Sequence, residues 1–260
     1  MNINFSIITV TYNSKKDLLK TIKSVQSQTY SKFIHIIKDG LSNDKTDKID
    51  FSKYRNTFFY RSKDFGIYHA MNQALKYASN EYILYLNAGD IFFQENCLRD
   101  LYENIRKNPN FNSYCGGTLQ IDPTNKKIKR IIGISNLYKY LPLAQLPHPS
   151  FVIKKSVLLK LNNPFDNSLK IGSDYKQQLV LRKKQLWRNC YLNQIISIMP
   201  IGGISNKNKL SIINGYLETL IFSFKLFNIK SIYIIIIKIL LNFYSKMISG
   251  KIKYKDIKYY

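Results

Sequence analysis

The sequence predicts an α/β protein with a doubly wound, mostly parallel sheet flanked by helices and a C-terminal helical appendage. Apolar segments of strand length alternate with segments of helical periodicity early in the chain, which is typical of parallel sheets. Several apolar segments end in polar or acidic residues, and ligands of open α/β sheets bind at such strand ends. From about residue 209 the chain becomes rich in Ile and aromatic residues. We therefore expect a main domain over residues 1–208 and a basic, aromatic helical region over 209–260.

The expected strands early in the chain are runs of apolar and β-branched residues, as in strands that are buried on both faces. They cover residues 5–13, 33–40, 57–62 and 82–87. Between them, apolar side chains recur at helical spacing and predict helices at residues 17–28 and 67–78. Farther along we expect helices at 97–108 and 173–185, strands at 113–121 and 126–134, and a strand running into a helix at 148–161.

The charge of the chain is strongly positive. Lys and Arg number 40 against 16 Asp and Glu, which gives a formal net charge of +24. Such a surface attracts polyanions, whether nucleic acid, an acidic membrane or phosphorylated substrates. The three cysteines form no CxxC pair and the N-terminus does not resemble a signal peptide. A cytoplasmic protein is therefore expected.

The C-terminal region contains two apolar runs, residues 210–227 and 231–244. The second run is interrupted by Lys238 and is shorter than the roughly 20 residues that a membrane span needs. We expect an interfacial or packed helix, and the basic tail KIKYKDIKYY (251–260) favours an anionic membrane surface. A helical appendage that only packs on the domain is an equally open interpretation.

Acidic residues fall at the ends of the expected strands. Asp39, Asp64 and Asp90 occupy such positions, together with the polar segment 11–13. The carboxyl ends of parallel strands meet at one edge of a sheet, so these side chains are expected to lie near each other. Gathered carboxylates repel one another unless a cation joins them, and a hard divalent ion that bridges a diphosphate would do so. Nearby Lys and Arg could hold phosphate oxygens.

A series of short motifs, taken in order, resembles those of glycosyltransferase family 2, which has the nucleotide-sugar-binding GT-A fold. The opening strand and helix resemble those of the family, and the matches run over roughly residues 4–206. The motifs are KDGLSNDKT (38–46) for the family's DDGSTDGT loop, SKDFGIYHAMNQAL (62–75) for D-x-G-x-x-x-A-x-N, LNAGD (86–90) for the acidic metal motif, HPSFVIKK (148–155) and IGSDYKQQL (171–179) for acceptor-side motifs, and GGIS (202–205) for a late loop of the bacterial polysaccharide branch.

The resemblance implies roles for individual residues. Asp39 would accept a hydrogen bond from the nucleotide base, Asp90 would bind Mn²⁺ or Mg²⁺, and Asp174 would be the general base. Asn87 and Gly89 stand where many relatives carry acids, which leaves one direct metal carboxylate. His148 and Arg182 would lie on the acceptor side. The nucleotide-sugar pocket would be formed by Thr11, Tyr12, Asn13, Asp39, Asp64, Gly66, Asn72, Asn87 and Ala88.

The activity implied by the resemblance is inverting, metal-dependent transfer of a hexose or N-acetylhexosamine. The donor would be a nucleotide sugar, in the first instance a UDP-sugar. The acceptor would be a glycan on undecaprenyl diphosphate, in O-antigen or capsule synthesis at the cytoplasmic face of the inner membrane. Two alternatives are a non-catalytic nucleotide-sugar-binding remnant and an RNA-binding protein. No RNA-recognition motif is present and the basic residues are dispersed, so no nucleic acid partner is expected.

Overall fold

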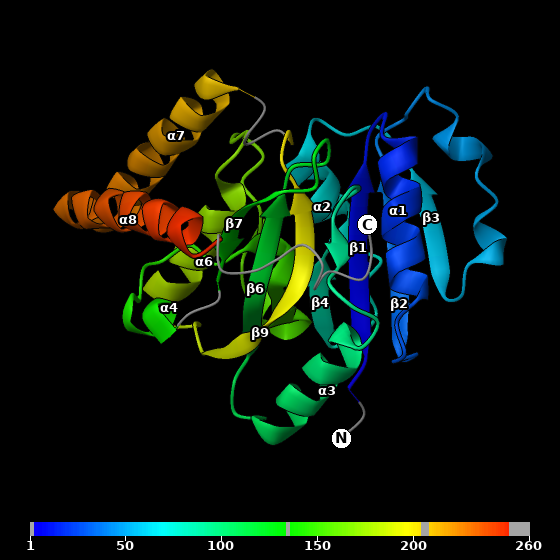
Figure 1. Ribbon diagram of the computed structural model, residues 1–260, viewed down its shortest axis with the longest axis horizontal. Coiled ribbons are helices and arrows are strands. Elements are labelled where there is room, and N and C mark those ends of the chain that lie inside the picture. The colour runs from blue at the N-terminus through cyan, green and yellow to red at the C-terminus, as the bar shows by residue number, and fades with distance from the viewer. Residues whose placement is uncertain (1–2, 134–135, 204–207, 250–260) are drawn as a thin grey trace.

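The computed structural model describes residues 3–133, 136–203 and 208–249 (Figure 1). Within them, a nine-stranded mixed sheet has helices on both faces, and the predicted α/β fold class is confirmed. The strands are β1 (Phe5–Thr11), β2 (Phe33–Asp39), β3 (Thr57–Arg61), β4 (Tyr82–Tyr85), β5 (Ile91–Phe92), β6 (Ser113–Ile121), β7 (Ile128–Ile132), β8 (Phe151–Lys154) and β9 (Asn189–Pro200). The helices are α1 (Lys15–Gln26), α2 (Ile67–Leu75), α3 (Cys97–Lys107), α4 (Asn136–Tyr140), α5 (Lys155–Leu158), α6 (Ser173–Lys183), α7 (Lys209–Phe227) and α8 (Ser231–Ser249). Four short 3-10 turns are η1 (Thr46–Lys48), η2 (Phe51–Lys53), η3 (His148–Ser150) and η4 (Asn228–Lys230).

The order of the strands creates a crevice at one edge of the sheet. The order is β3-β2-β1-β4-β8-β6-β9-β5, with β7 paired to β6. β3, β2, β1 and β4 are mutually parallel, and β8 runs antiparallel between β4 and β6. The chain moves outward from β1 to β3 and then returns through α2 to β4 on the other side of β1. This reversal places a topological switch point between β1 and β4, where open α/β sheets bind their ligands.

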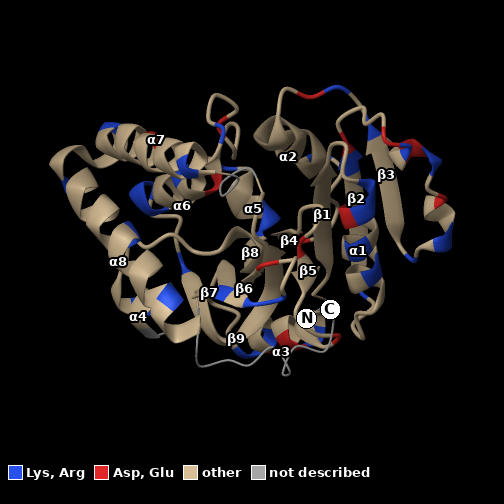
Figure 2. Cartoon of the chain, turned by 45° about the horizontal axis from the view of Figure 1, so that its top comes forward, with Lys and Arg blue, Asp and Glu red and all other residues tan. Residues whose placement is uncertain are grey.

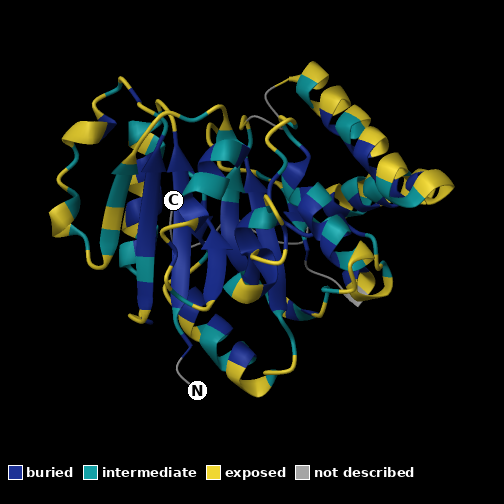
Figure 3. Cartoon of the chain, turned by 180° about the vertical axis from the view of Figure 1, so that it is seen from behind, coloured by how far each residue is buried: buried dark blue, intermediate teal, exposed yellow. Residues whose placement is uncertain are grey.

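Alternate residues of a strand point to opposite faces of the sheet, and each face is covered by its own set of helices. Ile8 and Val10 of β1 belong to the same apolar cluster as residues of α2, α5, α6 and α8. Phe5 and Ile7 belong to a second cluster with residues of α1 and α3. The central strands are almost entirely buried as a result (Figure 3).

Two strands were not expected from the sequence. β9 pairs in parallel with β6 over most of its length, and the short β5 pairs with its far edge. The apolar pattern of β9 is broken by Asn193 and Gln194, and the register of the β6–β9 pairing shifts beside Gly116. A bulge disturbs the period-two alternation by which a strand is recognised, so β9 was not predicted.

The last two helices form a unit that we call the C-terminal hairpin, residues 209–249 (Figure 1). α7 contacts α6, and α8 contacts β7 and α7. Phe222, Ile234, Ile237 and Leu241 of its inner face are buried in two apolar clusters. By length and composition alone, the helical stretch Lys209–Ser249 could cross a membrane. The basic tail and the end of the GGIS motif lie outside the described residues.

A buried histidine joins the three strands that lead to the switch point. Thr9 Oγ1 of β1 donates to the carbonyl oxygen of Leu86 (2.7 Å) after β4, and it contacts His35 Nε2 of β2 at 2.8 Å. Because the threonine proton is used on Leu86, the imidazole donates through Nε2, which leaves Nδ1 without a proton or a partner. Burial lowers the pKa of His35 to about 3.

We expect His35 to make the fold sensitive to acid. Its pKa is about 6.5 unfolded and about 3 folded, so the unfolded state binds the proton more readily and the free energy of unfolding falls as pH drops below about 6.5. Between about pH 7 and pH 5 this loss amounts to at most about 2 kcal/mol. Urea unfolding of wild type and His35→Leu at several pH values measures it. The His35→Leu curve should be flatter over this range, and parallel curves would contradict the assignment.

Candidate active site

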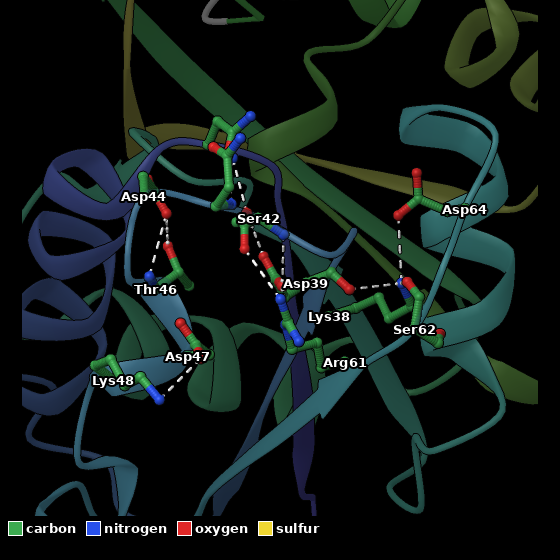
Figure 4. Close-up of polar contacts among 12 residues, drawn as sticks. Lys38, Asp39, Ser42, Asp44, Thr46, Asp47, Lys48, Arg61, Ser62 and Asp64 are labelled. Carbon is green, nitrogen blue, oxygen red and sulfur yellow. Dashed lines mark hydrogen bonds and ion pairs between the residues drawn. The ribbon is translucent and has the colours of Figure 1, made fainter.

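The carboxyl end of β2 carries a fixed carboxylate. Asp39 is fully buried and accepts hydrogen bonds from the backbone N–H (3.0 Å) and hydroxyl of Ser42. Arg61 Nε, at the end of neighbouring β3, lies 3.3 Å from the same carboxylate (Figure 4). Ser42 Oγ in turn accepts from the backbone N–H of Asn13 at 2.8 Å. Asp39 is therefore held in place, and it ties the loop after β2 to the end of β1.

A buried lysine next to Asp39 connects it to Asp64. The Lys38 ammonium is fully buried and donates to the carbonyl oxygens of Asp39 (3.0 Å) and Ser62 (2.8 Å). It also lies 3.3 Å from Asp64 Oδ2 (Figure 4). A Cβ atom at Gly40 would lie 2.6 Å from that oxygen, so glycine is what lets the Asp64 carboxylate approach the end of β2. Lys38 thus links the Asp64 carboxylate to the backbone of Asp39 at the end of β2.

The loops beside β1 complete this edge. Asn13 adopts a left-handed conformation with a φ of 49°, and its Oδ1 accepts from the N–H of Asn43 at 2.9 Å. Asp44 accepts from the N–H of Lys15 at 2.7 Å and so anchors its own loop to the start of α1. Tyr12 is 63% exposed, and its ring is available to a ligand at this edge.

Unpartnered oxygens lie at the switch point. Thr11 Oγ1 and Asn87 Oδ1 are both buried, and neither has a hydrogen-bond partner. The N–H of Ala88 bonds to the carbonyl oxygen of Val10 (3.3 Å), which places the segment after β4 beside the end of β1. Buried polar atoms normally have partners, so these two are expected to meet a ligand.

Asp90 follows directly and is 7% exposed. Burial raises the pKa of its carboxyl group to about 8, so a cation is needed to hold the charged form at neutral pH. Asp90 is hydrogen-bonded to the backbone of Asn87, and carboxylate and amide oxygens are donor types that Mg²⁺ and Mn²⁺ accept, so these two residues fit such an ion. Among the residues that the structure describes, no three His, Cys, Asp or Glu gather as a complete set of ligands. Phosphate and water would supply the remainder.

Helix α2 spans from this edge of the sheet to a second polar centre. Gly66, with a φ of 117°, precedes its first turn, and its N–H donates to Asp64 Oδ1 at 3.2 Å. In the first turn, the Tyr68 hydroxyl lies 3.3 Å from Asp174 Oδ1 and also donates to the carbonyl oxygen of Ile171. Asp64 and Asp174 are therefore connected through one helical turn.

Asn72 faces the second centre. Its side-chain amide donates to the carbonyl oxygen of Phe165 (2.7 Å) and accepts from the N–H of the same residue (3.1 Å). A further bond of 2.9 Å reaches Asn167. The amide therefore fastens α2 to the loop before α6, and a contact of Asn72 with the nucleotide sugar stays a prediction.

Asp174 stands half-buried in the first turn of α6, and Gln145 Nε2 lies 3.4 Å from its Oδ2. The His148 ring stacks on Tyr85 with 5.3 Å between centroids and meets Phe165 edge-on. Both ring nitrogens of His148 are buried without a partner. Burial lowers the pKa of His148, although the negative charge of Asp174 opposes that shift. The centre thus combines a carboxylate with an imidazole that is kept neutral.

Arg182 lies in the last turn of α6, the helix that carries Asp174 in its first turn. Its guanidinium stacks 3.8 Å from the Trp187 ring and donates to the carbonyl oxygen of Ala144 at 2.8 Å. Burial lowers the pKa of Arg182 to about 10. Its Nε and Nη1 have no hydrogen-bond partner, and the predicted contact with an acceptor phosphate remains to be tested.

Several residues of the site were missed from the sequence. Lys38 had a usable signal, because a lysine inside an otherwise apolar strand must find buried partners. Arg61 aligns with Asp39 across the β2–β3 pair, which becomes visible only when the register is known. Tyr68 and Gln145 reach Asp174 from distant segments; Tyr68 falls within the motif at 62–75, but nothing in the sequence indicates that either residue contacts Asp174.

Comparison with known proteins identifies relatives of the chain. A model of the family described as glycosyl transferase family 2 matches residues 6–160. The Escherichia coli protein UDP-Glc:alpha-D-GlcNAc-diphosphoundecaprenol beta-1,3-glucosyltransferase WfgD is 26% identical over 210 residues, which cover 79% of this chain and 77% of WfgD. An uncharacterized glycosyltransferase of Mycobacterium tuberculosis is 24% identical over 216 residues, or 82% of this chain and 81% of the relative.

Solved structures share the fold. S. aureus TarS 1–349 in complex with UDP-GlcNAc superposes with a TM-score of 0.69 at 16% identity, covering 98% of this chain and 77% of TarS 1–349. The mannosyltransferase PcManGT of Pyrobaculum calidifontis, in complex with GDP-Man and Mn2+, gives a TM-score of 0.63 at 13% identity over 96% of this chain and 74% of that one.

Replacing Lys38 should show how strongly the edge of the sheet around Asp39 and Asp64 depends on its buried charge. Lys38→Met leaves Asp64 and two carbonyl oxygens without their donor, and we expect a loss of about 3 kcal/mol in the free energy of unfolding. Adding Asp64→Asn should restore part of this loss, as a double-mutant cycle in urea would measure. Lys53→Met breaks an exposed ion pair with Asp50 and is the matched control, with a change below about 0.5 kcal/mol. Equal effects of the two lysine variants would contradict this role.

Proposed function

Because the chain belongs to glycosyl transferase family 2, we propose that it is an inverting glycosyltransferase acting on a lipid-linked glycan. It transfers a hexose or N-acetylhexosamine from a UDP-sugar. The observation that carries the proposal is the pairing of two polar centres across α2, one around Asp39 and Asp64 and the other around Asp174. The first suits a nucleotide sugar, and the second suits an acceptor hydroxyl.

The donor is assigned to the edge formed by β1, β2 and β4. Asp39 and Asp64 accept hydrogen bonds from the base and ribose, and the exposed Tyr12 ring covers the base. The unpartnered oxygens of Thr11 and Asn87 accept hydrogen bonds from the ligand or coordinate its cation. A preference for UDP is supported by two comparisons: TarS is known in complex with UDP-GlcNAc, and WfgD is named for UDP-Glc.

A Mn²⁺ or Mg²⁺ ion would be held by Asp90 with help from Asn87. When bound, it would neutralise the diphosphate that departs from the sugar. The same charge would offset the burial that otherwise keeps Asp90 protonated. PcManGT, which shares the fold, is described with Mn2+.

Transfer follows from the groups around Asp174. The acceptor hydroxyl gives its proton to the Asp174 carboxylate as its oxygen bonds to the anomeric carbon. The bond from that carbon to the diphosphate oxygen breaks on the opposite side, so the configuration inverts. Tyr68 and Gln145 orient the carboxylate from two sides. The neutral His148 ring, with both nitrogens free, can bind a sugar hydroxyl beside it.

The acceptor is proposed to be carried on undecaprenyl diphosphate, in O-antigen or capsule synthesis at the cytoplasmic face of the inner membrane. WfgD, by its name, acts on a diphosphoundecaprenol-linked sugar. The C-terminal hairpin would bring the chain to such an acceptor as a peripheral membrane protein. Fifteen of the 24 exposed large hydrophobic side chains among the described residues lie on it.

The outer face of the hairpin suits a bilayer with anionic headgroups. The exposed apolar residues recur at helical spacing along each helix, so each helix carries an exposed apolar stripe rather than scattered sites. Lysines are spread along both helices, whereas acidic residues are scarce there (Figure 2). The net charge of +24 adds a general attraction to anionic lipid.

Nucleotide binding tests the donor site. UDP with Mn²⁺ should raise the melting temperature by several degrees, since a ligand at about 100 times its Kd adds about 2.7 kcal/mol. Asp90→Asn should abolish the Mn²⁺-dependent part, and Asp39→Asn should weaken binding of UDP itself. Asp174→Asn should bind UDP as wild type does but fail to transfer. Asp47→Asn, which removes only the carboxylate that is paired with Lys48, is the control. The absence of any shift with UDP, GDP or dTDP would overturn the proposal.

Vesicle sedimentation tests the membrane surface. Leu240→Gln with Phe243→Gln should reduce binding to vesicles containing anionic lipid by roughly tenfold or more, because each change removes a large apolar side chain. The matched control is Phe58→Gln with Leu159→Gln, two similarly exposed residues outside the hairpin. Analytical ultracentrifugation without lipid addresses the other possible occupant of this face. A dimer that dissociates in the hairpin variant would assign the face to a second copy of the chain.

A further inference from the structure

One carboxylate of the C-terminal hairpin binds the loop that directly precedes the helix of Asp174. Glu218, midway along α7, accepts hydrogen bonds from three successive backbone N–H groups. The distances are 2.9 Å from Lys170, 3.0 Å from Ile171 and 2.8 Å from Gly172. Hydrogen bonds to a charged acceptor are roughly twice as strong as neutral ones. These three amides otherwise have no partner among the backbone bonds of the described loop.

The loop of residues 170–172 sets the position of α6 and of its first turn. Gly172 is the residue directly before the helix, and Asp174 is the second residue within it. The opposite side of the same loop is held by Tyr68, whose hydroxyl donates to the carbonyl oxygen of Ile171. The loop is therefore fixed from the N–H side by Glu218 and from the carbonyl side by α2. A shift of this loop would move the Asp174 carboxylate.

The fit between α7 and this loop is close. A Cβ atom at Gly172 would lie 2.8 Å from the Phe222 ring, and one at Gly215 would lie 3.2 Å from the Ile171 side chain. Phe222 also meets Tyr175 edge-on, with 6.0 Å between ring centroids. Two glycines thus allow α7 to approach closely enough for Glu218 to reach all three amides.

The charges of the hairpin single out Glu218. It is the one acidic residue between positions 209 and 249, among five lysines. Lys238 of α8 lies against the rings of Tyr175 and Tyr216 and donates to Oγ1 of Thr219, the residue after Glu218, at 2.7 Å. The one acid of this hairpin is directed inward onto the loop before α6.

We propose that Glu218 is a positioning residue for Asp174, so that the C-terminal hairpin is part of the acceptor half of the active site. This inference rests on the proposed function. The donor edge is built from β1, β2 and β4 and makes no use of α7. Loss of Glu218 therefore separates two properties: binding of the nucleotide is kept and sugar transfer is lost.

The test compares Glu218→Gln and Glu218→Ala with wild type, using the full chain. A displacement of a catalytic group by about 1 Å can cost about 100-fold in rate, so kcat should fall by roughly 10- to 100-fold. Glu218→Gln keeps one acceptor oxygen and should lose less than Glu218→Ala. The donor KM and the melting-temperature shift with UDP and Mn²⁺ should match wild type. Glu103→Gln, which removes an exposed glutamate from α3, should leave all of these values unchanged.

A second variant guards against a simple folding defect. Gly172→Ala keeps Glu218 but adds a Cβ that Phe222 obstructs, and it should reproduce the selective loss of kcat. The proposal is overturned if kcat stays within about twofold of wild type in both Glu218 variants. It is also overturned if kcat and the UDP shift decline together, which indicates a general structural role. A wild-type protein without any UDP shift would instead disprove the donor assignment.

Discussion

The parallel pairing of β1 between β2 and β4 is the constraint on which the site depends. It brings the ends of three strands to one edge, and Thr9 and His35 fix their relative position in the core. At that edge the buried Lys38 ammonium bonds to the carbonyl oxygens of Asp39 and Ser62 and to the Asp64 carboxylate. It thereby takes the place of the water molecules that would otherwise solvate these oxygens. Removing water from so many polar groups is unfavourable unless each is paired, and the few that are unpaired mark where a ligand binds.

The sequence was sufficient for those parts of the fold that are encoded locally. Strands β1, β2 and β4 are continuous apolar runs that end in polar residues, and the motifs around Asp39, Asp64 and Asp90 occur in the order typical of the family. The match of the family model to residues 6–160 confirms that identification. β9 was missed because a bulge disturbs its pattern. Local pattern fails wherever irregular backbone is stabilised by distant partners.

The acceptor half was harder to anticipate, because its residues come from separate segments. Tyr68, Gln145 and Glu218 meet around α6 only when the chain is folded, and none of them stands in a recognisable spacing with Asp174. Asn72 illustrates the same limit, since its amide fastens the loop at Phe165. Long-range hydrogen bonds carry no periodic signal, so the carboxylate could be named from a motif while the groups that hold it could not.

The hydrogen bonds of Glu218 to residues 170–172 mean that the smallest fully active part of this chain includes the C-terminal hairpin. A boundary near residue 208 looks natural from composition, and removing the apolar hairpin is an obvious way to make such a protein more soluble. The shortened chain would keep every residue of the donor edge but would lose the three hydrogen bonds that Glu218 makes with the loop before α6. Such a truncation would yield a sugar-nucleotide receptor in place of a transferase. Chimaeras between relatives would need to exchange α7 and that loop together.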